Sequence, residues 1–465
     1  MVECYYLSLC RFGVDFLLGY TDKMPFLQYI RGGVHAPHRK NTADMQTESC
    51  PVPDEVCVVM QQHIGAPCTP CVKKGDSVLV GTKLGDSDKP VSAPIYSGVS
   101  GTVADITEAT LSNGSASKAI IIKTDGLQTM ADDIAPPVIT NKDEFLAAVR
   151  ESGLVGLGGA GFPAHIKLNP KTPVDTLVIN GAECEPYITS DYREMVENTN
   201  DIISGIALVL EYLSFERAVI VVEDNKPKAI SMLKKAAAKS EYAEKISVLP
   251  TKAMYPRGAE KVTVYAATGR IIKSGQLPAD VGCVVMNVTS AATLARYIAT
   301  GMPLVNKRIT VDGSAVSQPK NIRVPVGTYI SDVIRFAGGY KCEPKKLIMG
   351  GPMMGVALPG EHMSVLKQTN AVLALDDVEA YPKPQSECIR CGRCLRVCPM
   401  SLSPTVIETH LKIKNTAALK TDGVLTCIEC GCCAYECPAM RPLVQVMRES
   451  KRLVKEIERK GEAQK

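Results

Sequence analysis

Two cysteine runs near the C-terminus constrain the fold of this chain more than any other feature. The first, CIRCGRCLRVCP, begins at Cys388, and the second, CIECGCCAYECP, begins at Cys427. Both have the spacing Cys-x₂-Cys-x₂-Cys-x₃-Cys-Pro, with which two-cluster bacterial ferredoxins bind iron. Zinc sites are more often built from two separated pairs of ligands, so zinc is the disfavoured alternative. The runs therefore predict two [4Fe–4S] clusters.

The ligands of each cluster are expected to come from both runs. In this type of motif, the fourth cysteine of one run binds the cluster of the other run. The two predicted ligand sets are Cys388, Cys391, Cys394 and Cys437 for the first cluster, and Cys427, Cys430, Cys433 and Cys398 for the second. The additional Cys432 is predicted to be a spectator. Such cross-ligation places the clusters close together, which suits a relay of single electrons.

Composition and charge exclude several classes of protein. The 465 residues suffice for three or four domains, at ~100–200 residues per domain. A formal net charge of +4 gives no sign of nucleic-acid binding. No apolar run approaches the ~18–20 residues of a membrane span, and the apolar N-terminus lacks the features of a signal peptide. The 18 cysteines are therefore expected in a reducing cytoplasm, as ligands and free thiols.

The N-terminal part divides into an extension and a β-rich domain. Residues 1–28 are an uncertain N-terminal extension. Residues 29–134 are rich in β-branched residues between Gly and Pro turns, and they resemble a barrel-sandwich domain, the fold of biotinyl and lipoyl carriers. The hairpin tip near Ala93–Gly98 has no Lys to carry such a group, so we expect a structural role. Cys68 and Cys71 form a CTPC in β-like sequence and are interpreted as adventitious thiols.

The remaining chain changes pattern twice. In residues 135–300, the apolar runs DTLVIN (175–180) and ERAVIVVED (216–224) read as buried parallel strands between helical patterns, which is typical of α/β domains. Residues 301–365 return to short strands with one helix and predict a small β-grasp-like module. Residues 366–465 hold the cysteine runs, several amphipathic helices and a basic helical tail, which is either a solvated face or a docking surface.

A glycine run opens the predicted α/β domain. GLVGLGGAGFPAHIKL contains Gly156, Gly158 and Gly159, and Lys167 follows. Closely spaced glycines allow backbone N–H groups to approach a phosphate, and a lysine adds a cation. A tight packing turn is the alternative interpretation of this stretch.

Further polar residues follow predicted strands. In α/β sheets, ligands bind at the carboxyl ends of parallel strands. The candidates at or near such ends are Asn180, Glu183 and Glu185 of NGAECEP, Gly258 and Glu260 of MYPRGAEK, and Asn287. For the last three, an ordinary turn or loop residue is an equally good interpretation.

These motifs resemble those of a known family. GLGGAGFPAHIK and NGAECEP resemble the flavin-binding motifs of the NADH-oxidising subunit of respiratory complex I. With GGVHAPHRK, YPRGAEK, GGPMMG and both cysteine runs, the chain is similar from about Tyr29 onward to the RnfC family, the NADH-binding subunits of ion-translocating Rnf complexes. It departs from the complex I pattern at Leu157, where an Arg is usual, and at Cys184 and Tyr187.

The resemblance implies cofactors, a fold and site residues. It implies non-covalent FMN in a Rossmann-like domain, an SLBB-like β-grasp module and a ferredoxin-like domain with two [4Fe–4S] clusters. Gly156, Gly158, Gly159 and Lys167 would then face the FMN phosphate or ribityl groups. Asn180, Glu183 and Glu185 would line the flavin and nicotinamide pocket, with Gly258, Glu260 and Asn287 as weaker assignments.

The resemblance also implies a function. A flavin couples two-electron hydride transfer to single-electron relay, so no residue is expected to act as a catalytic acid or base. Electrons would pass from NADH through FMN and the clusters to a membrane-bound partner, or in reverse from ferredoxin to NAD⁺. The expected partners are the other Rnf subunits, including the ferredoxin-like and membrane-embedded ones. The chain would lie peripherally on the cytoplasmic side of the cell (inner) membrane, while other subunits move Na⁺ or H⁺.

Two alternatives belong to other functional classes. One is a soluble reductase like PduS, the cobalamin reductase of bacterial microcompartments. The other is a non-catalytic two-cluster relay that has lost its flavin. Intact GGAGFP and NGAECEP motifs favour flavin binding over the relay.

Overall fold

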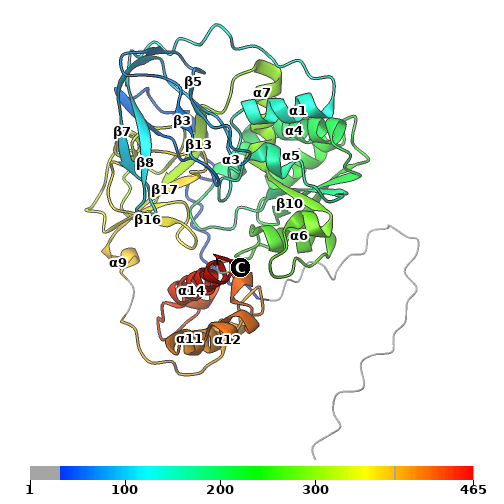
Figure 1. The fold of residues 1–465 in the computed structure, drawn as a ribbon, viewed down its shortest axis with the longest axis vertical. Helices are drawn as coiled ribbons and strands as arrows, with labels where there is room; N and C mark the ends of the chain where they lie inside the picture. Colours follow the sequence, from blue (N-terminus) through cyan, green and yellow to red (C-terminus); the bar gives the residue numbers. More distant parts are fainter. Residues whose placement is uncertain (1–31, 382–383, 464–465) are drawn as a thin grey trace, which may run out of the picture.

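The computed structural model describes residues 32–381 and 384–463, so the predicted extension at residues 1–28 lies outside the described residues. A β-rich unit, an α/β unit and a third sheet form the upper body in Figure 1, and a helical unit lies below them. The first three units share long boundaries, whereas the helical unit is joined through loops.

The N-terminal unit is built from two small antiparallel sheets. The first sheet has the order β2 (Glu55–Val59), β8 (Ala116–Thr124), β7 (Gly101–Thr110) and β4 (Ser77–Val78). The second has the order β3 (Thr69–Pro70), β5 (Lys83–Asp86) and β6 (Ile95–Tyr96). Val58, Leu84, Ile95 and Ile120 are fully buried in the core that the two sheets share. This arrangement agrees with the barrel-sandwich prediction.

The central unit contains a parallel sheet of four strands. Their order is β11 (Ile246–Thr251), β10 (Arg217–Glu223), β9 (Thr176–Gly181) and β12 (Cys283–Asn287). The two apolar runs predicted as strands form β9 and β10. Because these strands are covered on both faces, almost every residue is apolar rather than every second one.

Helices cover both faces of this sheet. One face packs on α1 (Lys142–Glu151), α3 (Ser190–Glu197), α4 (Thr199–Tyr212), α5 (Pro227–Ala237) and α7 (Val288–Thr300). The other face packs on α6 (Glu260–Thr268), which lies between the sheet and the helical unit in Figure 1. The glycine run lies between α1 and the short helix α2 (Ala164–Lys167).

The third unit is a mixed sheet of six strands. Its order is β1 (Thr47–Ser49), β14 (Lys320–Pro325), β13 (Asn306–Asp312), β17 (Ala371–Leu375), β15 (Lys346–Met349) and β16 (Val356–Leu358), with α8 (Ile330–Phe336) against one face. Strands β1 and β17 come from outside residues 301–365, where the module is predicted. The sheet thus connects the start of the described chain to its C-terminal part.

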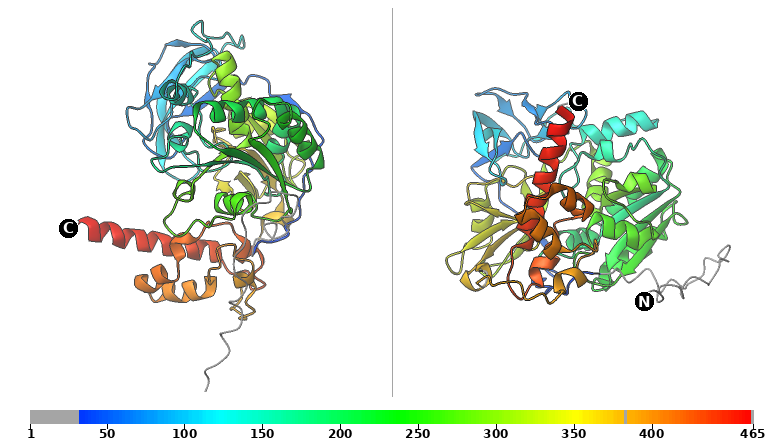
Figure 2. Two further views of the ribbon diagram at one scale, coloured as in Figure 1. Left: turned by 90° about the vertical axis from the view of Figure 1, so that its right-hand side faces the viewer. Right: turned by 60° about the horizontal axis from the view of Figure 1, so that its bottom comes forward.

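The C-terminal unit is helical. After α9 (Asp377–Ala380), it contains α10 (Arg393–Arg396), α11 (Pro404–Lys412), α12 (Thr416–Thr421), α13 (Cys432–Tyr435) and α14 (Leu443–Ala463). Ile407, Leu419 and Met447 are buried where α11, α12 and α14 pack together. The far end of α14 projects away from the body, as the left view of Figure 2 shows. Along the described chain, no helix has both the length and the apolar character that crossing a bilayer requires.

Candidate functional site

Two asparagines mark the carboxyl edge of the parallel sheet. Strands β9 and β12 are neighbours, and their register places Asn180 directly beside Asn287. The Asn180 amide donates to the Gly258 carbonyl at 2.8 Å. The Asn287 amide donates to Asp191 at 2.7 Å, and its side-chain oxygen caps α7 by accepting the Thr289 N–H at 2.8 Å. Two loops and two helices are therefore fixed around this edge, where α/β folds bind ligands.

The glycine run passes over the same edge. A Cβ added to Gly158 would lie 2.6 Å from Asn287 Nδ2, so no larger residue fits there. A Cβ on Gly159 would meet nothing within 4 Å, and both glycines are exposed. The loop therefore presents bare backbone beside an amide side chain, as a phosphate or ribityl chain requires. Gly156 contacts only the Phe162 backbone at ordinary distance and serves the turn itself.

Lys167 and Glu260 meet on one flank of the site. Lys167 Nζ lies 2.6 Å from Glu260 Oε1, and about a third of the lysine side chain is exposed. A half-exposed ion pair of this kind contributes at most ~1 kcal/mol to stability. An anionic ligand can therefore compete with Glu260 for the lysine. The structure thus brings six predicted residues to one edge: Gly158, Lys167, Asn180, Gly258, Glu260 and Asn287.

Glu183 is turned away from this open edge. Its carboxylate accepts the backbone N–H groups of Asp191 at 2.7 Å and Tyr192 at 3.2 Å, at the start of α3. Only 6% of the residue is exposed. Burial raises the pKa of Glu183, although Lys40 opposes the shift. The position of this side chain makes it a helix cap.

Glu185 anchors a loop from the third unit. Its carboxylate accepts the N–H groups of Met353 at 3.0 Å and Met354 at 2.8 Å, both in GGPMMG. A Cβ on Gly351 would lie 2.2 Å from Glu185 Oε2, so the loop needs glycine there. Burial raises the pKa of Glu185 to about 7. The predicted pocket role of Glu183 and Glu185 stays a prediction, because both carboxylates are bonded to backbone.

Lys40 is a site residue to which sequence reasoning gave no role. Its ammonium donates to the carbonyls of Glu183 at 2.8 Å, Glu185 at 2.7 Å and Ile188 at 2.5 Å. It thereby fixes the loop that follows β9. The motif GGVHAPHRK contains it, but nothing in that pattern indicates a contact with a loop more than a hundred residues away.

The cysteines of the first run lie near the last cysteine of the second. Burial raises the pKa of Cys394, and Cys437, Cys388 and Cys391 raise it further as neighbouring thiols. The Arg390 N–H points to Cys388 Sγ at 3.4 Å. This is the cross-ligated set predicted for the first cluster.

The other four predicted ligands line one cavity. Cys398, Cys427, Cys430 and Cys433 surround it, among the apolar side chains of Ile428, Val444 and Met447. In the described part of the chain, no three His, Cys, Asp or Glu side chains converge closely enough to hold a single ion. Four thiols around an apolar cavity are nevertheless the donor set that a [4Fe–4S] cluster uses. Cys432 also borders the cavity, but its thiol points to the Tyr255 carbonyl at 3.9 Å.

The second cysteine run contacts the flank of the glycine-loop site. The Tyr255 hydroxyl donates to the Cys430 carbonyl at 2.7 Å. Three residues along the chain, the Gly258 N–H points to Cys184 Sγ at 3.3 Å. MYPRGAEK therefore contacts NGAECEP at one end and the cavity of the second cysteine set at the other.

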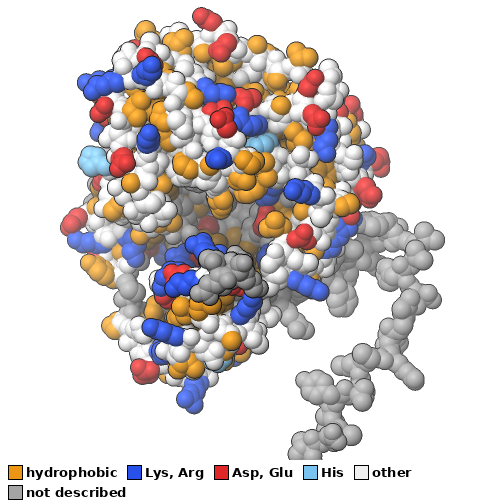
Figure 3. Space-filling view, viewed as in Figure 1, with side chains coloured by type: hydrophobic (Ala, Val, Ile, Leu, Met, Phe, Trp, Pro, Cys, Tyr) orange, Lys and Arg blue, Asp and Glu red, His pale blue; other side chains and the backbone are white. Residues whose placement is uncertain are grey.

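The first cysteine run, by contrast, faces solvent. Cys391 is exposed, and 66% of Ile389 is accessible. Arg390, Arg393 and Arg396 are exposed around it. Lys and Arg side chains stand out on this unit in Figure 3, among hydrophobic ones.

Four family models match consecutive parts of the chain. The RnfC barrel sandwich hybrid domain matches residues 28–127, and the Nuo51 FMN-binding domain matches residues 149–296. The SLBB domain matches residues 308–357, and the 4Fe-4S dicluster domain matches residues 383–438. Together they confirm the predicted fold class.

Curated relatives are similar along nearly the whole chain. The C-type subunit of the proton-translocating ferredoxin:NAD(+) oxidoreductase complex of Clostridium ljungdahlii is 43% identical over 390 residues, covering 82% of this chain and 84% of that protein. Its counterpart in the Na(+)-translocating complex of Acetobacterium woodii is 41% identical over 438 residues, covering 93% and 98%. The counterpart in the ion-translocating oxidoreductase complex of Rhodobacter capsulatus is 36% identical over 429 residues, covering 91% and 82%.

Proposed function

We propose, from the premise that the chain belongs to the RnfC family of ion-translocating ferredoxin:NAD(+) oxidoreductase complexes, that it passes electrons between NAD(H), FMN and two [4Fe–4S] clusters. The observation that carries the proposal is the contact chain from the glycine loop to the cysteine cavity. Asn180 donates to the Gly258 carbonyl, and Tyr255 in the same loop donates to the Cys430 carbonyl. A flavin site and a cluster site are thereby joined through three residues of one loop.

FMN fits the carboxyl edge of the sheet. Gly158 and Gly159 offer bare backbone, Lys167 offers a cation, and Asn180 and Asn287 offer amides whose positions are fixed by their own hydrogen bonds. Bound there, FMN supplies the exchange between hydride and single electrons. The residues of this chain bind the group, orient it and connect it to the cysteine unit. We assign none of them a proton transfer.

The position of the two cysteine sets suggests an order of electron transfer. The set of Cys398, Cys427, Cys430 and Cys433 lies against the loop of Tyr255, while the set that contains Cys391 is exposed. Electrons would enter through the buried set and leave through the exposed one. The exposed arginines around Cys391 make this face, rather than the basic tail of α14, our choice for the partner.

The partners follow from family membership. They are the other subunits of the Rnf complex, including its ferredoxin-like and membrane-embedded subunits. The chain is a subunit of a membrane-associated complex, and we place it on the cytoplasmic side, attached through those partners. The similarity over more than four fifths of the length of these relatives favours this function over a PduS-like soluble reductase. The open glycine loop favours it over a relay without flavin.

The testing experiment is anaerobic. The purified chain is analysed for iron and FMN, and NADH is then added while visible and EPR spectra are recorded. We expect about eight irons and one flavin per chain, with bleaching of the flavin and signals of reduced clusters. Eight irons without flavin, and no response to NADH after reconstitution with FMN, would leave only the relay.

A matched pair of glycine variants ties the flavin to its loop. Gly158→Ala places a methyl group 2.6 Å from Asn287 Nδ2 and should lower FMN affinity at least tenfold. Gly360→Ala, at an exposed glycine with open space, should leave the affinity unchanged. Equal FMN affinity in both variants would remove the glycine loop from the proposed site.

A further inference from the structure

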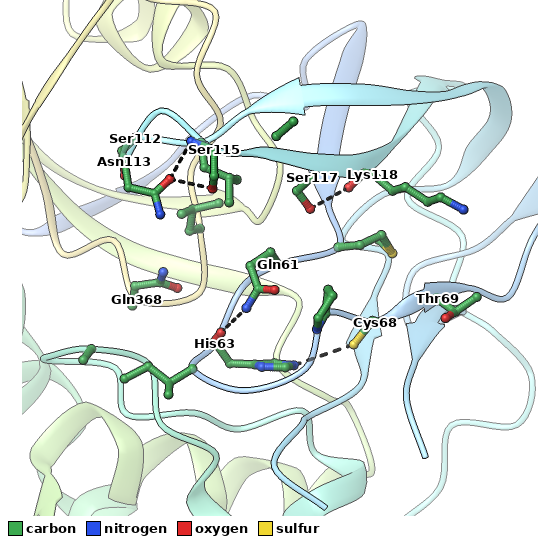
Figure 4. Close-up of a pocket in the computed structure, with 17 residues that line it drawn as sticks. Gln61, His63, Cys68, Thr69, Ser112, Asn113, Ser115, Ser117, Lys118 and Gln368 are labelled. Atoms are coloured by element: carbon green, nitrogen blue, oxygen red, sulfur yellow. Dashed lines mark hydrogen bonds between the residues drawn. The ribbon is translucent and has the colours of Figure 1, made fainter. Parts of the chain in front are cut away.

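A hollow lies on the side of the glycine loop away from the sheet edge. Its walls come from the loop after β2, the hairpin between β7 and β8, and a segment before β17. Figure 4 shows Gln61 and His63 from the first wall, Asn113 and Lys118 from the second, and Gln368 from the third. Ala160 of the glycine loop closes one end. No motif in the sequence points to this hollow, because three distant segments build it.

Two of its walls carry buried polar atoms without partners. His63 is 5% exposed, and its Nε2 accepts the Ala93 N–H at 3.1 Å, which assigns the ring proton to Nδ1. That Nδ1 has no partner among the described residues, and neither has Gln368 Oε1. A buried donor and a buried acceptor left open in one hollow are costly unless a ligand or water completes them.

The His63 ring is a neutral donor at neutral pH. Burial and the nearby Lys367 lower the pKa of His63 to about 4. The ring therefore suits an uncharged acceptor, such as a hydroxyl or a ring nitrogen. Lys118, exposed at the rim, is the cation available for an anionic group.

Apolar side chains complete the hollow. Ile64, Leu111 and Leu366 lie among the serine and amide groups of the walls. An apolar surface with a few fixed polar groups is the ordinary lining of a site for a flat heterocycle and its sugar. Three serines on the hairpin, Ser112, Ser115 and Ser117, can bond sugar hydroxyls.

The glycine loop connects this hollow to the proposed flavin site. Ala160 lines the hollow, while Gly158 approaches Asn287 at the sheet edge. Two residues of chain span at most ~8 Å, so the two sites are neighbours. The Ile64 N–H also donates to the Gly161 carbonyl at 3.2 Å, which ties the loop to the wall of the hollow. An extended dinucleotide could lie across the exposed backbone of Gly159.

We propose that this hollow binds the adenosine half of NAD(H), with the pyrophosphate over Gly159 and Ala160 and the nicotinamide at the flavin. His63 Nδ1 donates to the adenosine, Gln368 Oε1 accepts from it, and Lys118 attracts the phosphate end. The inference rests on the proposed function and adds to it a subsite built by the barrel-sandwich unit and the third unit.

The test compares two hydride donors. Reduced nicotinamide mononucleotide carries the nicotinamide of NADH without the adenosine. Anaerobic stopped-flow flavin reduction should give a dissociation constant at least tenfold lower for NADH in the wild type. Gln368→Leu and Lys118→Gln should each raise the NADH constant roughly 3–10-fold, the loss expected for one hydrogen bond or charge contact. The constant for the mononucleotide and the saturating rate should not change.

Lys123→Gln is the matched control. Lys123 is an exposed lysine on the same strand, β8, but does not line the hollow. Its constants should equal those of the wild type for both donors. The proposal is overturned if the wild type does not distinguish the two donors, if Gln368→Leu weakens both alike, or if Lys118→Gln and Lys123→Gln behave identically.

A binding measurement separates this inference from the proposed function. ADP-ribose, which lacks the nicotinamide, is titrated into the FMN-loaded chain by calorimetry. We expect binding that NADH displaces and that Gln368→Leu weakens. If NADH fails to reduce the flavin, the proposed function fails, and this titration still decides the hollow. Absence of ADP-ribose binding to the wild type contradicts the subsite directly.

Discussion

At the scale of single residues, the two glutamates of NGAECEP have different partners. Glu183 caps α3, and Glu185 holds the N–H groups of Met353 and Met354. Their spacing in sequence indicates polar groups at a strand end, and both do lie there. The partners of Glu185 come from a loop about 170 residues later, so no local pattern could predict its role.

Glu185 should make stability depend on pH. Burial raises its pKa from 4.5 to about 7, so the folded chain retains a proton that the unfolded chain releases. The stability that this proton contributes is fully present below about pH 4.5 and is lost as pH rises through 7. Glu185→Gln has no such proton. We expect the unfolding free energy of the wild type minus that of the variant to fall by on the order of 2–3 kcal/mol from pH 5 to 7.5. Denaturant titrations at both pH values measure this, and parallel pH profiles would contradict it.

Cys432 and Cys433 are adjacent and should respond differently to substitution. The Cys432 thiol points to the Tyr255 carbonyl, whereas Cys433 lies in the set predicted to bind a cluster. Cys432→Ser should retain about eight irons per chain, and Cys433→Ser about four. Iron analysis of anaerobically purified variants measures the difference. Loss of iron in Cys432→Ser alone would exchange the two roles.

At the scale of elements, α7 connects stability to cofactor binding through its first residue. Asn287 caps α7 with its side-chain oxygen, and its amide nitrogen faces the glycine loop. Asn287→Ser keeps a capping oxygen but removes the amide, and Asn287→Ala removes both. We expect both variants to lose FMN affinity, while only the alanine variant loses ~1 kcal/mol of stability. Fluorescence titration with FMN and unfolding curves measure the two effects. Normal FMN binding by the serine variant would exclude the amide from the site.

The parallel strands were predictable, but the third sheet was only partly so. Continuous apolar runs such as DTLVIN are typical of strands buried on both faces, and β9 and β10 have this pattern. Strand β1 has only three residues, with two of them exposed, and it pairs with β14 across more than 270 positions. Pairing of that kind depends on the surrounding fold and leaves no periodic pattern in the sequence.

At the scale of the whole molecule, the order of the two clusters can be tested by removing one at a time. Cys391 belongs to the exposed set and Cys430 to the set beside Tyr255. In Cys391→Ser, NADH should still reduce the remaining cluster at the wild-type rate. In Cys430→Ser, NADH should reduce the flavin while the remaining cluster is reduced at least tenfold more slowly. Freeze-quench EPR measures both rates, and the opposite pattern would reverse the proposed order.

The cysteine spacing predicted which thiols lie together, because the ligand pattern is local and repeated. The contact between the cysteine unit and the flavin edge was not predictable, because it depends on one hydroxyl, Tyr255, and one carbonyl, that of Cys430. The adenosine hollow was also missed, since its walls come from residues near 63, 118 and 368. Sites between units are formed by packing, and a sequence shows packing only within each unit.

The contact of the Gly33 N–H with the Val397 carbonyl has a consequence for biosynthesis. The segment that supplies Lys40 leaves the ribosome early, but its partner Val397 is translated among the last residues. Lys40 holds the loop after β9 by three carbonyls, so that loop reaches its final form only when the cysteine unit is present. A nascent chain therefore cannot complete its flavin edge before the cysteines are made. Maturation of the two cofactors is tied to one late event, the closure of the chain's two ends.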